Sequence, residues 1–213
     1  MYLSDGDLQA AIERGELICD PRPNSIDPTS IDLHLGALGT AKVWDIERYR
    51  RTCEGQGLAG PELRLGTSRS RAFGDDWLVP IPEFDARKDK AEQPVFLRNG
   101  VEVVVQPRGF LLWQTHEKVG TPEEGASLIC FVNSKSMKAR TGLVVHLTAP
   151  TIHTSWKGTV TLEIANLGPF DFVLTPGDAV AQLTVARVQS VPKMTMREAG
   201  SVTYGQTEAS GSA

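Results

Sequence analysis

From residue 95 onward, short apolar runs alternate with residues that form turns. Each run is rich in branched or aromatic residues, and Gly, Pro or Asn stands between most of the runs. This pattern is typical of a β-sandwich or a β-barrel, in which many short strands follow one another closely. We predict strands at residues 101–105, 110–115, 127–132, 143–147, 159–165, 170–174 and 179–188.

The first part of the chain shows weaker periodicity. Ser4 is a suitable N-cap for a helix that ends at Gly15. Apolar and polar side chains alternate over residues 31–35, which predicts a short strand. Residues 50–90 are rich in Gly, Arg and Asp, and we expect a long excursion there with short structure around residues 77–81.

The composition favours one globular domain. The 213 residues are 40% hydrophobic and 23% charged, which is ordinary for a globular protein. No internal repeat is visible, so we predict a single β-rich domain over residues 1–204 and a flexible tail over residues 205–213. A net charge of −4 provides no general attraction to a nucleic-acid polymer or an anionic membrane, and we expect neither as a partner.

The cysteines and the N-terminus point to the cytoplasm. Cys19, Cys53 and Cys130 form no C-x-x-C pair, which suits a reducing compartment. The first residues carry no basic segment followed by an apolar run, and no window approaches the ~20 apolar residues of a membrane span. We therefore expect a cytoplasmic protein.

Hydroxyl and cationic side chains gather in residues 134–140, Ser-Lys-Ser-Met-Lys-Ala-Arg. Lys135, Ser136 and Arg140 could offer charged and hydroxyl donors to phosphate oxygens. The alternative interpretation is a solvated loop that opens a short helix. Composition alone leaves both interpretations open.

Glu163 is the candidate general base. In the strand predicted over residues 159–165, one face holds Val160, Leu162 and Ile164, and the other holds the carboxylate. Desolvation in a partly dry site would raise the pKa of this carboxyl group toward the range of a general base. The alternative is that Glu163 lies on the wet face of an amphipathic strand.

The histidines do not form a metal-binding pattern. His146 and His153 lack a ligand spacing, and no pair of cysteines lies near them. The zinc-dependent deaminases carry H-x-E with P-C-x-x-C, and this chain has neither motif. We predict no catalytic metal bound by protein side chains.

Taken in order, seven segments of the chain resemble motifs of the dCTP deaminases, a branch of the dUTPase superfamily. The likeness runs from about residue 3 to residue 207, and the order of the motifs makes it specific. The matching segments are S-I-D-L-H-L-G at 30–36, G-F-L-L-W-Q-T-H-E-K-V at 109–119, S-K-S-M-K-A-R-T-G-L at 134–143, H-L-T-A at 146–149, G-T-V-T-L-E-I-A-N at 158–166, P-G-D-A-V-A-Q at 176–182 and Y-G-Q-T at 204–207.

The resemblance implies a fold and a reaction. The fold would be mainly β, a distorted jelly-roll-like β-barrel with a few short helices. Three copies would form a homotrimer with active sites shared between subunits. The reaction would be metal-independent hydrolytic deamination of dCTP, or a closely related deoxycytidine nucleotide, to dUTP and ammonia, with Mg²⁺ accompanying the triphosphate.

The resemblance also implies roles for particular residues. Glu163 aligns with the catalytic glutamate of the family. Ser136 and Arg140 align with residues that hold the charge and the water of the site. The backbone of Thr148 and Ala149 would orient the water and read the edge of the base.

Further residues are candidates for binding the nucleotide. Lys135 and Ser136 would contact the triphosphate, and Tyr204 and Gln206 belong to a tail that would close over it. Trp156 is interpreted as a packed aromatic side chain at a turn and is also a candidate contact. The remaining candidates for substrate binding are Met137, His153 and Gln182.

Departures from the family pattern keep other functions open. His153 stands where the family has an Asp that contacts the 3′-hydroxyl of the sugar, and Met137 replaces a Ser of the phosphate motif. One alternative is a dUTP pyrophosphatase or a bifunctional deaminase that also makes dUMP, although His153 argues against it. The other is a non-catalytic, nucleotide-binding regulatory trimer. The chain could be a plain β-sandwich binding module with an unrelated ligand only if the ordered motifs were coincidental.

Overall fold

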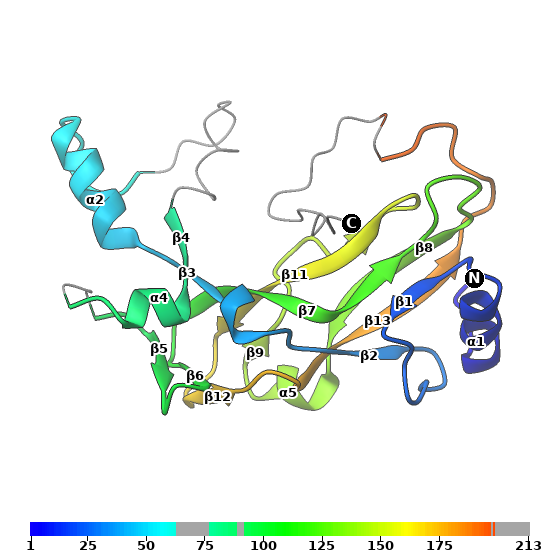
Figure 1. The fold of residues 1–213 in the computed structure, drawn as a ribbon, viewed down its shortest axis with the longest axis horizontal. Helices are drawn as coiled ribbons and strands as arrows, with labels where there is room; N and C mark the ends of the chain where they lie inside the picture. Colours follow the sequence, from blue (N-terminus) through cyan, green and yellow to red (C-terminus); the bar gives the residue numbers. More distant parts are fainter. Residues whose placement is uncertain (63–76, 89–91, 197, 199–213) are drawn as a thin grey trace, which may run out of the picture.

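Two long antiparallel strands, β7 (Phe110–Gly120) and β11 (Lys157–Asn166), form the centre of the computed structural model (Figure 1). Their register places Leu162 opposite Trp113, and it shifts at a bulge between Thr159 and Thr161. The structure describes residues 1–62, 77–88, 92–196 and 198.

All three sheets of the described chain are antiparallel. The largest has the order β4 (Leu78–Pro80), β3 (Lys42–Trp44), β7, β11 and β9 (Leu143–Val144), and β1 (Ile18–Asp20) also pairs with β7. The second has the order β10 (Thr151–Ile152), β8 (Leu128–Ser134), β13 (Ala179–Arg187) and β2 (Ile31–His34). The third has the order β12 (Phe172–Leu174), β6 (Glu102–Val105) and β5 (Val95–Arg98).

The two larger sheets meet where the end of β2 reaches β7. Leu35 bridges to Thr115, and the Gly36 N–H donates to the Gln114 carbonyl at 2.9 Å. A Cβ atom at Gly36 would lie 2.9 Å from that carbonyl oxygen, so the close approach requires glycine. The buried Trp113 indole donates to the Gly36 carbonyl and fixes the same junction.

Short helices lie at the edges of the sheets. They are α1 (Asp5–Glu13), the 3₁₀ turn η1 (Leu38–Thr40), α2 (Ile46–Gly55), α4 (Ile81–Asp85) and α5 (Ser136–Arg140). The predicted first helix is confirmed, because Ser4 is its N-cap and Gly15, with φ of 72°, follows its end. Among the described residues, no helix has the length and apolar character needed to cross a membrane.

The prediction of a mainly β fold is confirmed, and each predicted strand is present with shifted bounds. The sheets do not close into a barrel over the described residues, because no ladder joins the outer strands of one sheet to another. The strand predicted over residues 143–147 is shorter than expected, since β9 covers two residues. Beyond it, the Val145 N–H donates to the Ser134 hydroxyl instead of continuing the ladder.

Helix α2 was not predicted from the sequence. It projects from the body of the molecule in Figure 1, and Cys53 is its one buried residue. Apolar residues are few in its sequence, IERYRRTCEG, so the sequence gives little indication of a helix packed on a core. Contacts at its start hold it in place: the Asp45 side chain accepts from the Arg48 N–H and pairs with Arg87, and the Arg48 guanidinium lies over Trp77.

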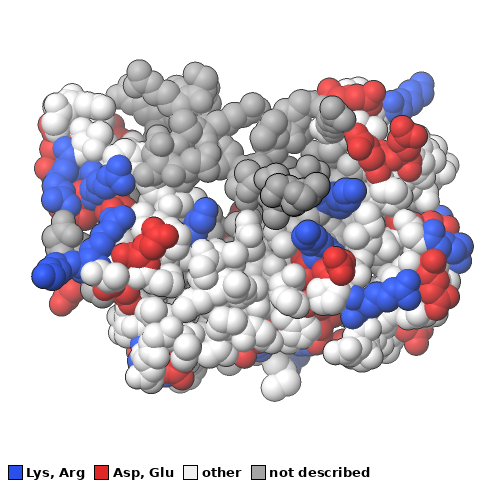
Figure 2. Space-filling model, viewed as in Figure 1, with Lys and Arg blue, Asp and Glu red and all other residues white. Residues whose placement is uncertain are grey.

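Charged side chains of both signs gather at the two ends of the face in Figure 2, over α2 and α4 at one end and α1 at the other. The middle of this face carries few of them. Mixed signs at each end produce no large field of one sign, which agrees with the small net charge of the chain.

Asn166 provides a test of the packing around β11. Its buried amide donates to the Val105 and Phe170 carbonyls at 2.8 and 2.6 Å and accepts from the Gly168 N–H at 2.9 Å. In Asn166→Ala these backbone groups lose their partner, which should lower the free energy of unfolding by about 2 kcal/mol. Urea denaturation followed by circular dichroism measures the change.

The matched control is Gln9→Ala on the exposed surface of α1, which should change the free energy of unfolding by no more than ~0.5 kcal/mol. Equal denaturation midpoints for the two variants would contradict the role of Asn166.

Candidate active site

Glu163 lies near the middle of β11, opposite Leu112 of β7. The predicted division of this strand into two faces is confirmed, since Val160, Leu162 and Ile164 are buried and Glu163 is half-buried on the other face. The apolar face packs into the core and thereby fixes the direction of the carboxylate. Glu163 is therefore not a freely solvated side chain of a wet face.

The main chain of a neighbouring segment holds the Glu163 carboxylate. The Glu163 N–H donates to the Val145 carbonyl at 3.1 Å, and the Leu147 N–H donates to Glu163 Oε2 at 2.9 Å. No hydrogen bond from the described residues reaches Oε1. One oxygen of the carboxylate is thus anchored, and the other remains available for chemistry.

The segment that anchors Glu163 contains two of the predicted residues. Thr148 and Ala149 follow Leu147 directly and are exposed. Their position is fixed by the bond from Leu147 to Glu163 and by the β10 strand that begins at Thr151. The structure therefore brings the predicted water-orienting backbone next to the predicted base.

Two polar atoms close to this segment are buried without a hydrogen-bond partner in the described chain. They are His146 Nδ1 and Thr161 Oγ1. Thr161 lies on the same face of β11 as Glu163, two residues before it. A buried polar group without a partner lowers the stability of the folded protein. These two atoms near Glu163 are therefore able to form further hydrogen bonds.

The phosphate-like motif folds as α5, preceded by Lys135 as N-cap. Ser136, Met137 and Arg140 are exposed, and Met137 is 80% exposed. The side chains of Ser136 and Arg140 make no hydrogen bond or ion pair with other described residues. Their donors are therefore available to a ligand or to a second molecule.

Both lysines of the motif already have partners. Lys135 pairs with Asp32 of β2, and the Lys138 ammonium donates to the Ala179 carbonyl of β13 at 2.5 Å. Lys135, predicted to contact phosphate, thus has much of its charge compensated by Asp32. Neither Asp32 nor Lys138 was predicted as a site residue, although Asp32 stands in the S-I-D motif at an outward position of an alternating strand.

Helix α5 is connected to β11, which carries Glu163, through β9. Their connection passes Gly142, whose carbonyl accepts from the Leu167 N–H at 2.9 Å just beyond β11. Gly142 has φ of 98°, and a Cβ atom there would lie 2.3 Å from the Gly168 nitrogen. In the part of the chain that the structure describes, no hydrogen bond or ion pair links Ser136 or Arg140 to Glu163.

The remaining predicted residues are more widely spread. Gln182 is half-buried in β13, opposite Asp32 and Asn133, and His153 is exposed just after β10. Trp156 is half-buried, with its ring against Gly158, and its carbonyl accepts from the Thr121 N–H, as expected of a packed aromatic at a turn. The predicted residues Tyr204 and Gln206 lie outside the described residues.

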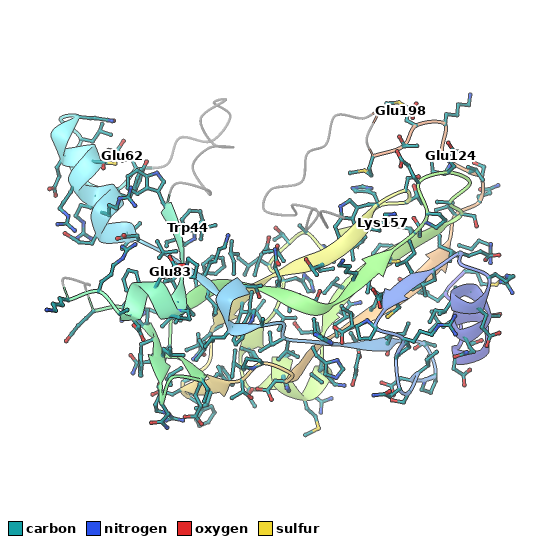
Figure 3. All side chains as sticks on the ribbon, viewed as in Figure 1. Trp44, Glu62, Glu83, Glu124, Lys157 and Glu198 are labelled. Atoms are coloured by element: carbon teal, nitrogen blue, oxygen red, sulfur yellow. The ribbon has the colours of Figure 1, made fainter. Side chains whose placement is uncertain are left out.

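Figure 3 shows where β11, the strand that carries Glu163, begins. Lys157, at the start of the strand, lies at the same end as Glu124 in the turn after β7. Glu163 follows six residues later. Leu112 of β7 lies opposite it on one side, and on the other side the Val145 carbonyl, just past β9, accepts from its N–H.

Two cysteines are unsuited to nucleophilic chemistry. Burial raises the pKa of the Cys19 thiol to about 11 and that of the Cys130 thiol to about 12. Both remain protonated near neutral pH, and a protonated thiol is a poor nucleophile. Among the described side chains, no group of three or more His, Cys, Asp or Glu is arranged to hold a metal ion.

Comparison with known proteins identifies the family. The family model described as dCTP deaminase-like matches residues 60–188. The dCTP deaminase of Haloarcula marismortui is 30% identical over 193 residues, covering 89% of this chain and 82% of that protein. The dCTP deaminase of Buchnera aphidicola is 31% identical over 186 residues, covering 86% and 82%.

A solved structure shares the fold. The 2′-deoxycytidine 5′-triphosphate deaminase from Agrobacterium tumefaciens superposes with a TM-score of 0.54 at 16% identity, covering 90% of this chain. The chain spans about half of that protein, 49% of its length. The match of the family model over more than half of the residues, together with these relatives, shows that the chain belongs to the dCTP deaminase-like family.

Proposed function

We propose that this protein catalyses the hydrolytic deamination of dCTP, or a closely related deoxycytidine nucleotide, to dUTP and ammonia. The observation that carries the proposal is the anchored carboxylate of Glu163 beside the exposed backbone of Thr148 and Ala149. The relatives named dCTP deaminases support the choice of reaction and substrate.

In this mechanism Glu163 acts as the general base. Its unengaged oxygen takes a proton from a water molecule and passes it to N3 as the hydroxide adds to C4 of the cytosine ring. Glu163 then takes the proton of the new C4 hydroxyl and passes it to the departing amine. Collapse of the adduct to the C4 carbonyl breaks the C4–N4 bond, and ammonia leaves. The backbone of Thr148 and Ala149 orients the water and the edge of the base. No protein-bound metal takes part.

The phosphates are assigned to α5. Ser136 offers a hydroxyl and Arg140 a guanidinium, both exposed and unengaged within the described chain. Guanidinium groups bind phosphate oxygens through two parallel hydrogen bonds. Mg²⁺ would arrive with the triphosphate as part of the substrate. Lys135 contributes less than its charge suggests, because Asp32 already compensates it.

Shared active sites in a homotrimer are part of the proposal. Since no hydrogen bond or ion pair among the described residues links Ser136 or Arg140 to Glu163 within one chain, a neighbouring copy can supply one half of the site. Exposed apolar side chains support such an interface, since Met137 on α5 and Leu147 beside Glu163 are 80% and 48% exposed. The complete site would then form between two chains.

A non-catalytic nucleotide-binding trimer is the second candidate. It is favoured by the compensated charge of Lys135 and by Met137 at a position where the motif offers a hydroxyl. It predicts nucleotide binding without ammonia release. A dUTP pyrophosphatase or bifunctional enzyme would instead release pyrophosphate, which a product assay separates from ammonia.

Replacing Glu163 by Gln removes the base and keeps the shape of the side chain. We expect ammonia release from dCTP to fall by about 10²- to 10⁴-fold. Binding of dCTP should persist, because the amide can still accept from the Leu147 N–H. Ammonia is measured by a coupled assay, and binding by equilibrium dialysis.

Glu124→Gln is the control for this variant, because Glu124 is an exposed carboxylate in the turn after β7. Its turnover should equal that of the unmodified protein. Undiminished turnover in Glu163→Gln would contradict the assignment of the base.

Sharing of sites between chains can be tested by mixing inactive variants. Co-expressed Glu163→Gln and Arg140→Ala chains should form some sites with an intact Glu163 from one chain and an intact Arg140 from the next. If chains combine at random in a closed ring, about one quarter of the sites are intact, and about one quarter of the activity should return. Activity no greater than that of the separate variants would show that each site lies within one chain.

His153 tests the recognition of the sugar. If this exposed side chain takes the place of the family Asp, His153→Asp should raise kcat/KM for dCTP relative to 2′,3′-dideoxy-CTP, which lacks the 3′-hydroxyl. A carboxylate accepts a hydrogen bond from a 3′-hydroxyl more strongly than a neutral imidazole does. The ratio of the two kcat/KM values is the measurement, and an unchanged ratio would exclude a role for His153 in selectivity.

A further inference from the structure

A cavity of about 710 Å³ opens at the far end of β7, away from Glu163. Four parts of the chain line it: the loop after β1, β2 with the residues that follow it, β7, and the turn before β13. Its volume lies within the range of roughly 300–1,000 Å³ that is typical of small-molecule sites. The cavity therefore has room for an organic ligand.

The cavity is separate from the proposed catalytic base. His116, which lines it, lies four residues along β7 from Leu112, the partner of Glu163. At ~3.4 Å per residue this separation is on the order of 13 Å. The lining includes no residue of α5 and none of the segment that anchors Glu163. Asp32 is the link between the regions, because it lines the cavity and pairs with Lys135.

A buried carboxylate orients one imidazole in the cavity. The side chain of Glu117 is 7% exposed and accepts from the His34 N–H at 2.9 Å and from His34 Nδ1 at 2.6 Å. A carboxylate accepts hydrogen bonds, so Nδ1 carries the hydrogen in this contact. In a neutral ring of this tautomer Nε2 is an acceptor, so His34 serves to shape the cavity and does not donate to an anion.

Both carboxylates of the cavity are already engaged. Glu117 is held by His34, and Asp32 is paired with Lys135. By contrast, the side chains of Arg22 and His116 make no hydrogen bond or ion pair with any described residue. The uncommitted polar groups are therefore mainly donors and cations. The other uncommitted polar side chains of the lining are Asn24 and Ser25.

We propose that this cavity binds a small phosphate-bearing molecule through Arg22 and His116. The guanidinium provides a two-pronged contact with one phosphate, and the His116 imidazole and nearby amide and hydroxyl groups can reach its other oxygens. Prolines on both sides of the cavity, Pro21, Pro23 and Pro176, can cover an apolar part of the ligand. This inference goes beyond the proposed deamination and does not rest on it.

A ligand bound in the cavity would also affect the phosphate motif of residues 134–140. Asp32 forms part of the wall and holds Lys135, which directly precedes α5. An anion beside Asp32 would repel its carboxylate and alter its pairing with Lys135. The cavity would thus be a second anion site with a physical connection to the nucleotide-binding helix.

Calorimetric titration with inorganic pyrophosphate tests the site on the full-length protein in its native assembly. Arg22→Ala should weaken binding about tenfold or more, because a charged hydrogen-bond donor is lost from the site. His116→Ala should weaken it severalfold. Both residues are exposed, so both variants should fold normally, as circular dichroism can verify.

Two further variants separate this cavity from other anion sites. Arg51→Ala removes an exposed arginine of α2 that is remote from the cavity lining and should leave binding unchanged. Ser136→Ala weakens the proposed triphosphate contact and should keep the binding that depends on Arg22. The proposal is overturned if native protein binds no pyrophosphate at millimolar concentration, if Arg22→Ala binds like the unmodified protein, or if Ser136→Ala alone abolishes binding.

Discussion

The pairing of β7 with β11 is the constraint on which the candidate site depends. The ladder runs over nearly the whole length of both strands. The strand faces that carry Leu162 and Trp113 are buried in the core. Because side chains alternate across a strand, burying one face directs Glu163 to the other. A slip of one residue would move the carboxylate into the core, where its charge would be severely destabilised.

Backbone groups that leave the regular ladders complete the site. β9 ends after Val144. In the segment that follows, the Val145 carbonyl still accepts from the Glu163 N–H of β11, but the Val145 and Leu147 N–H groups donate to the Ser134 hydroxyl and to the Glu163 carboxylate. Irregular chain at this point leaves Thr148 and Ala149 exposed beside Glu163. The same side of the molecule therefore combines a rigid base with backbone groups that remain available to a substrate.

Ion pairing divides the polar residues of the chain into engaged and free groups. Lys135, Asp32, His34 and Glu117 are held by one another in two pairs. Ser136 and Arg140 on α5, and Arg22 at the cavity, have no such partner within the described chain. This division decides which residues can meet a ligand, and residue type alone does not reveal it.

The mainly β fold, the capped first helix, the two faces of β11 and the family can all be read from the order of the residues, because alternation of apolar residues and ordered motifs are local properties of the chain. Helix α2 cannot, since it buries one residue and depends on contacts with Trp77 and Arg87. Three further features appear only once the chain is folded: Lys135 is paired with Asp32, the sheets stay open over the described residues, and Leu147 anchors Glu163. These features join residues far apart in the chain, and their geometry follows from packing and not from local pattern.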